Sequence, residues 1–256
     1  MLEDPYRWVE AIRNRREYVD DQLKTASPVV GCTYQDGLLL LTTTPGPRKL
    51  FEVYNQLAFA AIGHPADIEK LRKAVIDIAH LEAFNLSASD VSLHRLVHFG
   101  IGPLVKSAFD EIFRSPYLAR VLVAELDPSQ GQECFFTVDA DGSFASHRDV
   151  VAMSGLAAAQ PVIVDQLNAA TGDLHKLTLE AALDRALNAW AHGHLPLADG
   201  DHPAPDDDTV RQFLSTALST ARIEAAVLDR TMPTKSKFRL LSAAEIEPLR
   251  LRYAGR

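Results

Sequence analysis

The sequence has little of what would place the chain in several large classes of protein. It contains only two cysteines, Cys32 and Cys134, which form neither a metal-ligand spacing nor a disulfide framework. No run approaches the roughly 18 apolar residues of a membrane span. The N-terminal stretch MLEDPYRWVEAIRNRREYVDD is charged throughout and has no apolar segment typical of a signal peptide. We therefore expect a soluble, cytoplasmic protein that does not enter a membrane.

Basic charge and cofactor motifs are also scarce. The formal net charge of −8 argues against a nucleic-acid-binding surface. Phosphate-loop, dinucleotide and G-x-S-x-G patterns are absent. Nine histidines are present, and His94 and His98 are four apart on a predicted helix, but no glutamate follows His94 as in H-E-x-x-H. His192, His194 and His202 form a second loose group. We predict no bound metal and no other cofactor.

The first part of the chain predicts one helix and then four strands. Asp4-Pro5 is typical of a helix start, and apolar residues recur at helical spacing from there to the region of Pro28: Trp8, Ile12, Val19 and Leu23. VVGCTY and LLLLTTT then flank a tight turn at Asp36-Gly37. KLFEVY and LAFAAIG follow as two further strands. Their nearly continuous apolar runs predict a sheet that is covered on both faces.

The rest of the chain alternates blocks of helix and strand. One helix is expected up to about Phe84, and a longer one, capped by Ser87 or Ser89, up to Ile112. Four strands, two helices over 155–170 and 178–193, two closing strands and a terminal helix come next. The segment 195–208 predicts a mobile surface loop in which Asp206 to Asp208 are solvated. Segregated blocks indicate a single α+β domain over residues 1–256.

Four stretches, arriving in order, carry a resemblance to a known family: KLFEVYNQLAFAAIGHPADIEKLR, ASDVSLHRLVHFGIGPL, FTVDADGSFASHRDVVAMSG and TARIEAAVLDRTMPTKSKFRLLSAAEI. Together they resemble the α subunits of actinobacterial-type 20S proteasomes, over roughly residues 5–255. The resemblance implies a four-layer α-β-β-α sandwich of the N-terminal-nucleophile superfamily, with an added N-terminal helix. It also implies assembly into heptameric rings.

Within that superfamily, a catalytic subunit frees a threonine at its own N-terminus, whose amine serves as base for the hydroxyl. Ser27 falls where that threonine would stand, but Pro28 follows it. The second strand ends LLTTTPGPRK, without the expected aspartate, and Thr42, Thr43 and Thr44 lie at the strand end, where they are poor nucleophile candidates. Residues 7–24 indicate a structured helix rather than a propeptide. We expect a non-catalytic subunit.

The resemblance assigns docking and gating roles to a few residues. Lys49 opens a strand fourteen positions before Gly63. In related α subunits the matching lysine pairs with the C-terminal carboxylate of an activating ATPase. Glu17 and His64 are expected to line the same pocket, although Glu17 on a solvated helix face fits the sequence equally well. Residues 1–27 form a gate segment and first helix, with the gate itself at Met1, Leu2, Glu3, Asp4 and Pro5.

The expected partners are six further copies of this chain, proteasome β subunits, an AAA+ ATPase activator that docks through its C-terminal tail, and unfolded protein substrates in transit. Two alternatives stay open. One is a divergent self-processing N-terminal-nucleophile peptidase that uses Ser27. The other is a self-standing ring of the proteasome type with no β partner.

Overall fold

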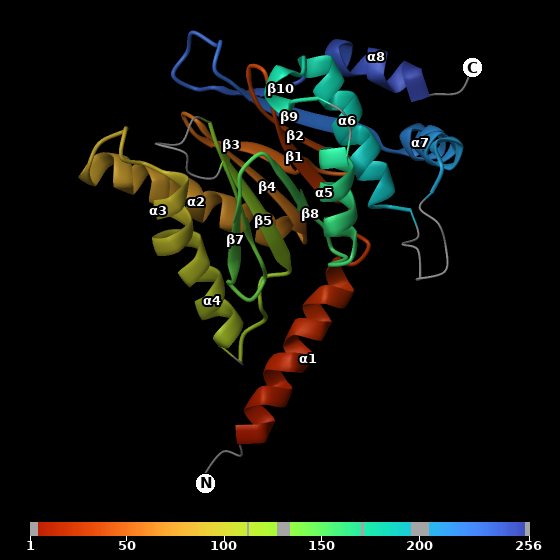
Figure 1. Ribbon diagram of the computed structural model, residues 1–256. Helices are drawn as coiled ribbons and strands as arrows, with labels where there is room; N and C mark the ends of the chain where they lie inside the picture. Colours follow the sequence, from red (N-terminus) through yellow and green to blue (C-terminus); the bar gives the residue numbers. More distant parts are fainter. Residues whose placement is uncertain (1–4, 112, 127–133, 170–171, 196–204, 254–256) are drawn as a thin grey trace.

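A computed structural model describes residues 5–111, 113–126, 134–169, 172–195 and 205–253. Two antiparallel five-stranded sheets lie face to face in it, with helices over both outer faces (Figure 1). The first sheet has the order β10-β9-β2-β1-β8 and the second has the order β3-β4-β5-β6-β7. The predicted four-layer α-β-β-α sandwich with an added N-terminal helix is confirmed.

The strands lie close to where the apolar runs predicted them. The first sheet consists of β1 (Val29–Tyr34), β2 (Gly37–Thr44), β8 (Val150–Met153), β9 (Arg222–Asp229) and β10 (Phe238–Leu240). The second consists of β3 (Leu50–Tyr54), β4 (Leu57–Gly63), β5 (Ala119–Glu125), β6 (Phe135–Val138) and β7 (Phe144–His147). Every residue of β1 and β2 is buried, as continuous apolar strands between two layers require.

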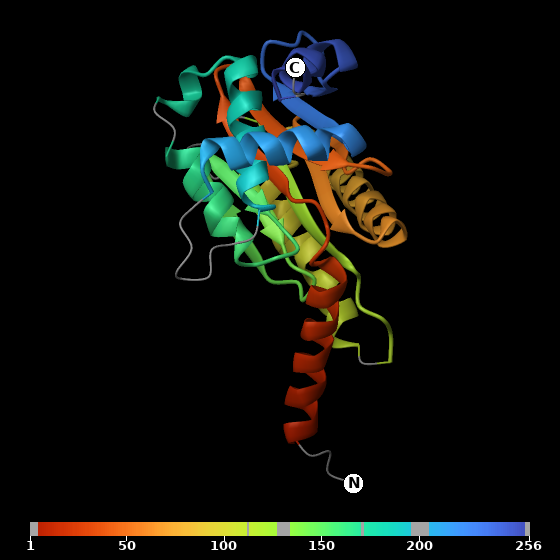
Figure 2. The ribbon, with the colours of Figure 1, turned by 90° about the vertical axis from the view of Figure 1, so that its right-hand side faces the viewer.

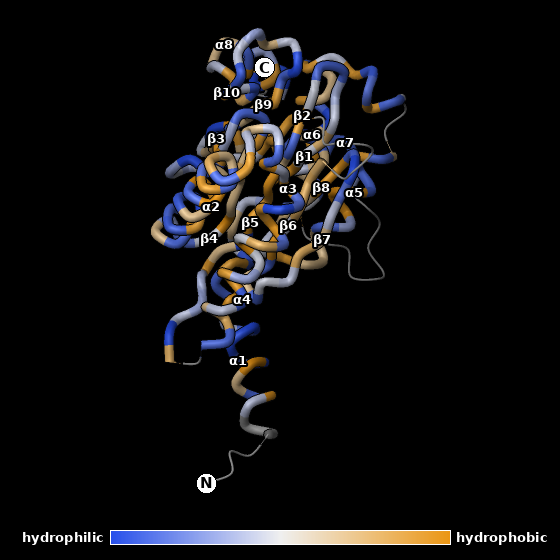
Figure 3. Tube along the Cα trace, turned by 90° about the vertical axis from the view of Figure 1, so that its left-hand side faces the viewer, coloured by the Kyte–Doolittle hydropathy of each residue, from blue (hydrophilic) through white to orange (hydrophobic). Residues whose placement is uncertain are grey.

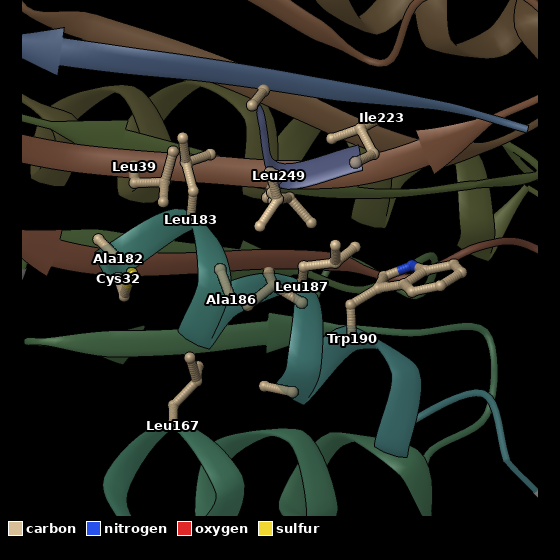
Figure 4. Close-up of a cluster of buried hydrophobic side chains, with 14 of the residues drawn as sticks. Cys32, Leu39, Leu167, Ala182, Leu183, Ala186, Leu187, Trp190, Ile223 and Leu249 are labelled. Atoms are coloured by element: carbon tan, nitrogen blue, oxygen red, sulfur yellow. The ribbon is translucent and has the colours of Figure 1, made fainter. Parts of the chain in front are cut away.

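Three apolar cores hold the four layers together. One fills the space between the sheets and includes Phe135 and Leu122. A second packs the first sheet against α5 (Ala159–Ala169) and α6 (Leu179–His192), where Trp190, Leu183 and Leu187 point toward the strands (Figure 4). The third packs the second sheet under α2 (Pro65–Asn85) and α4 (Gly102–Asp110). Interdigitated cores of this kind fix the layers relative to one another.

The helix α1 (Pro5–Leu23) extends away from the sandwich (Figures 1 and 2). Its last turns are attached to the body. Val19 and Leu23 are buried against Ala140, and Asp20 accepts a hydrogen bond from the buried Arg120 at 2.7 Å. The apolar face predicted for this helix is therefore buried only toward its C-terminal end, since Trp8 remains 47% exposed.

Gly155 lets the end of α1 approach the body closely. A Cβ at this position would lie 1.8 Å from the Leu23 carbonyl oxygen. A side chain there is incompatible with the observed path of the backbone.

The prediction of one long helix that is capped by Ser87 or Ser89 and ends at Ile112 is wrong in its start and in its regularity. Ser92, rather than Ser87 or Ser89, caps a short helix α3 (Leu93–Arg95), which continues as a π-helix over Leu96–Ile101 and then as α4. Pro103 has no backbone N–H to donate, and just before it the Gly102 N–H bonds to Val97, five residues back. A π-type bulge next to proline accommodates this missing donor.

The prediction of a loop over residues 195–208 is also wrong at its C-terminal end. Asp206 caps a helix, α7 (Asp207–Thr220), by accepting from the Thr209 N–H at 2.8 Å. Asp207 and Asp208 lie in the first turn, where negative side chains favour the helix dipole. Residues 196–204 of the predicted loop lie outside the described residues. The chain ends its described part with α8 (Ala243–Tyr253).

Candidate functional site

Lys49 and Gly63 border the same cavity, of about 410 Å³, at one end of the β3–β4 hairpin. Antiparallel pairing places them there. Leu50 lies opposite Ala60, and the Ala61 N–H donates to the Lys49 carbonyl at 3.2 Å. The fourteen-residue spacing is thus the length of one hairpin. The rest of the lining is Thr44, Pro45, Gly46, Pro47, Arg48, Phe51, Pro65, Ile68 and Glu69.

Gly63 has a backbone conformation that only glycine adopts readily, with φ +127°. A Cβ at this position would lie 2.0 Å from the Leu118 carbonyl oxygen. The glycine that closes β4 is therefore required by the backbone path between β4 and β5.

The Lys49 side chain is turned inward. Its Nζ donates to the Ser27 carbonyl at 3.1 Å and lies 3.5 Å from the Thr43 carbonyl. Burial lowers the pKa of the Lys49 ammonium to about 8, and the negative charge of Glu224 opposes this shift. The structure thus excludes the interpretation of Lys49 as a freely solvated lysine at a strand end.

Glu224 fixes the segment that carries Lys49. This carboxylate is 7% exposed and comes from β9, in the other sheet. It accepts hydrogen bonds from the backbone N–H groups of Lys49, at 3.1 Å, and Leu50, at 3.0 Å. A buried carboxylate is stable when its oxygens are satisfied in this way. Sequence reasoning did not identify Glu224; the one signal is an acidic residue inside an apolar strand.

Ser27 and Thr43 adjoin the same lysine. The Ser27 hydroxyl lies 3.2 Å from that of Thr43 and accepts a hydrogen bond from the Trp190 indole N–H at 3.0 Å. The Thr42 and Thr44 hydroxyls donate to the Pro28 and Pro47 carbonyls. Two residues that sequence reasoning considered separately, Ser27 as a nucleophile and Lys49 as a docking residue, thus meet at one place.

The backbone amine of Ser27 is not free in this arrangement. It forms a peptide bond with Ala26, whose own N–H donates to the Leu23 carbonyl at the end of α1. A nucleophile of this class requires its own terminal amine as base. As long as the chain is continuous through α1, the Ser27–Lys49 pair lacks that group.

The structure does not place Glu17 or His64 in the described lining of the cavity. Glu17 lies on the exposed face of α1 and forms an ion pair with Arg13 at 3.7 Å. His64 caps α2, with its Nδ1 accepting from the Ala66 N–H at 3.3 Å. Of the gate residues, Met1 to Asp4 lie outside the described residues, and Pro5 begins α1.

The histidine pairs show structural contacts. The rings of His94 and His98 are stacked with centroids 3.8 Å apart, and His98 bonds to the His94 carbonyl. His194 packs against Trp190, and its pKa is lowered by burial and by the charge of Lys49. Within the described ranges, no group of three or more His, Cys, Asp or Glu side chains could hold a metal ion. His202 lies outside those ranges. None of the described helices is long and apolar enough to cross a membrane.

Comparison with known proteins gives a consistent result. The family model described as "Proteasome subunit" matches residues 23–194. A proteasome subunit alpha from Pseudarthrobacter chlorophenolicus is 26% identical over 250 residues, covering 94% of this chain and 95% of that protein. Proteasome subunits alpha from Gordonia bronchialis and Rhodococcus erythropolis are each 28% identical, over 94% of this chain and 86% and 89% of theirs.

Proposed function

The chain belongs to the proteasome subunit family, and we propose that it is the non-catalytic α-type subunit of a bacterial 20S proteasome in the cytoplasm. In this proposal seven copies form a ring that supports assembly of the β ring and restricts the passage of unfolded protein. The ring also receives an ATPase activator in ATP-dependent protein degradation.

The observation that carries the proposal is the attachment of α1 to the body of the subunit through buried and hydrogen-bonded side chains. The relatives named alpha match 94% of this chain. The helix is fixed to the body by Arg120 and by Arg15, whose Nη2 donates to the carbonyls of Ala108 and Glu111. An attached helix serves as part of a ring subunit, whereas a propeptide must leave to free the nucleophile.

Exposed apolar side chains support an assembly. Trp8 and Val9 are 47% and 66% exposed on α1. A second group lies on the layer of α2 and the π-helix, where apolar and polar positions are interspersed along α2 (Figure 3); it consists of Leu81, Phe84, Leu86 and Phe99. Obligate ring interfaces bury surfaces of this kind. We assign both groups to contacts with other subunits.

The cavity at Lys49 and Gly63 is the proposed receptor for the C-terminal tail of the activator. Its walls include Phe51, Pro65 and Ile68, which suit an apolar side chain, and cationic groups stand beside it. A terminal carboxylate captured by a cation in a partly dry site is a recurrent mode of peptide recognition. The gate is proposed at Met1 to Pro5.

Native mass spectrometry of the chain co-expressed with the β subunit of the same genome tests the assembly. We expect a double-ring complex in which this chain retains α1. A mature chain that begins at Ser27 would instead support the self-processing peptidase. The contact between Ser27 and Lys49 is the reason for testing that alternative. Rings without any β subunit would support the self-standing alternative.

Replacement of Lys49 by alanine tests the docking role. The Lys49→Ala complex should assemble normally, but its degradation of casein should respond less to the ATPase of the same genome. Arg211→Ala, at an exposed position on α7 outside the cavity, is the matched control. Unchanged stimulation in Lys49→Ala would contradict the proposed docking site.

A further inference from the structure

A cavity of about 690 Å³ lies between the end of α7 and α8, apart from the proposed docking cavity. We call it the α7–α8 cavity. Its volume is in the range of sites that hold a ligand. Apolar side chains from α7, β9, the residue after β10, and α8 contribute to its lining: Leu218, Ile223, Leu241 and Ile246.

Positive charge at the rim of the α7–α8 cavity is only partly matched. Arg48 is exposed and forms no hydrogen bond or ion pair with any residue that the structure describes. Arg222 donates to the Gly46 carbonyl at 3.0 Å, and this partner carries no net charge. The other charged groups of the lining are matched: Arg250 pairs with Glu247, and Glu224 accepts from backbone N–H groups. The rim therefore suits a partner that brings a carboxylate.

The helix α1 carries an exposed segment of complementary chemistry. Val9 is 66% exposed, and Glu10 beside it is exposed and has no hydrogen bond or ion pair among the described residues. Adjacent helical residues lie about 100° apart around the helix axis, so one surface can contact both. The other charged side chains that the structure describes on α1 have partners: Arg13 with Glu17, Arg16 with Asp141, Asp20 with Arg120, Asp21 with Lys24, and Arg15 with backbone carbonyls.

These two surfaces lie at opposite ends of the molecule. The helix α8, beside the cavity, and the free end of α1 are far apart in both ribbon views (Figures 1 and 2). One chain therefore does not cover its own Val9 and Glu10. A contact between unlike surfaces of identical copies is heterologous, and its repetition closes a ring when the rotation between copies allows it.

We propose that the α7–α8 cavity receives the N-terminal half of α1 from a neighbouring copy of this chain, with Val9 on the apolar lining and Glu10 paired with Arg48. This inference rests on the proposed ring of copies and names the surfaces that join them. Glu10 and Arg48 each gain a counter-charge that the described part of their own chain does not supply. Removing the exposed Val9 from water adds a favourable apolar contribution.

Exchange of the two charges tests the pair. Glu10→Arg, Arg48→Glu and the double variant Glu10→Arg/Arg48→Glu are each co-expressed with the β subunit of the same genome and measured by native mass spectrometry. The matched control is Glu10→Arg/Arg211→Glu, which restores the net charge at an exposed arginine outside the cavity. Circular dichroism verifies that each variant folds.

Each single reversal places like charges together, and we expect it to lower the yield of rings about tenfold or more, the factor typical of one charge-assisted contact. The double variant should recover most of the yield, whereas the control should stay as low as Glu10→Arg. Single reversals that assemble like the unaltered chain overturn the inference while the proposed function stands. A double variant that assembles no better than the control does the same.

A disulfide reports the contact directly. With Glu10→Cys and Arg48→Cys in one chain, mild oxidation should join the copies into a ladder that extends beyond dimers on a non-reducing gel. Either single cysteine should give no such ladder. Dimers alone, or no cross-link, would contradict a heterologous contact at these residues.

The same native spectra distinguish other outcomes. A small anion that the unaltered ring retains, and that an intact Arg48→Glu ring loses, would identify a different occupant of the cavity and overturn the inference. If the unaltered chain forms no ring with or without the β subunit, the proposed function itself fails.

Discussion

Arg120 is the residue whose replacement should detach α1 from the body. Its side chain is 8% exposed, and it donates to Asp20 on α1, to Asp139 after β6, and to the carbonyls of Ser154 and Gly155 before α5. A single guanidinium thus joins segments that are separated by more than 100 residues. Methionine at this position would fill part of the volume but would remove the arginine donors from all four acceptors, of which Asp139 keeps the Ala140 N–H.

The structure allows the size of this effect to be estimated. Removing one partner of a buried ion pair costs about 3–5 kcal/mol. Asp20 and Asp139 are about half exposed, at 49% and 46%, so water can solvate them once the arginine is gone. The lower end, about 3 kcal/mol, is therefore expected for Arg120→Met. Arg16→Met is the matched control, because the Arg16–Asp141 pair also connects α1 to the body but Arg16 is 59% exposed, and such pairs contribute about 0–1 kcal/mol.

Two measurements check this prediction. Urea unfolding gives the free-energy difference, and hydrogen exchange followed by mass spectrometry reports the protection of residues 15–23. Arg120→Met should lose protection in that segment, whereas Arg16→Met should not. If Arg120→Met is no less stable than Arg16→Met and α1 stays protected, the attachment of α1 through Arg120 is refuted.

Two further predictions concern other contacts. Gly155→Ala should destabilise the protein and displace the end of α1, because its Cβ would meet the Leu23 carbonyl; unchanged exchange protection of α1 would contradict this. Glu245 accepts from the N–H and hydroxyl of Ser242 at the start of α8, and these bonds lower its pKa to about 2. A carboxylate with a lowered folded-state pKa stabilises the fold above about pH 4.5 and loses that contribution as pH falls toward 2. Glu245→Gln should therefore reduce the loss of stability between pH 5 and 2 in acid titrations, and an unaltered titration would be inconsistent with this capping role.

Much of the sandwich could be predicted because apolar runs bounded by turn residues report directly on buried strands. The runs VVGCTY and LLLLTTT became β1 and β2. The turn between them is Gln35-Asp36, one residue before the predicted Asp36-Gly37, because Gly37 already pairs with Tyr34 in the sheet. The helix α7 was missed although Val210, Leu214 and Leu218 recur every four residues and are buried. Its acidic first turn resembles a solvated loop in composition. The helical spacing of the three buried residues is the signal in the sequence that predicts this helix.

The residues of the candidate site differ in whether their positions could be predicted from the sequence. The Lys49–Gly63 spacing could be read from sequence, since one hairpin sets it. Glu224 could not, because it reaches Lys49 across 175 residues from another sheet. Trp190 likewise meets Ser27 from a distant helix. Contacts of this separation depend on how the two sheets are stacked, and a single sequence carries no direct record of that stacking.

The position of Ser27 makes two roles mutually exclusive within one chain. A free Ser27 amine requires cleavage of the bond to Ala26, which would leave α1 held only by noncovalent contacts such as Arg120 to Asp20. The exposed Trp8 and Val9 would then be lost to the assembly if the helix departed. The Ser27–Lys49 contact, in contrast, forms through the Ser27 carbonyl and does not depend on a free amine. Lys49 can therefore stabilise the junction of α1 and β1 in a non-catalytic subunit. In such a subunit the buried ammonium holds the junction and the attached helix remains part of the assembly.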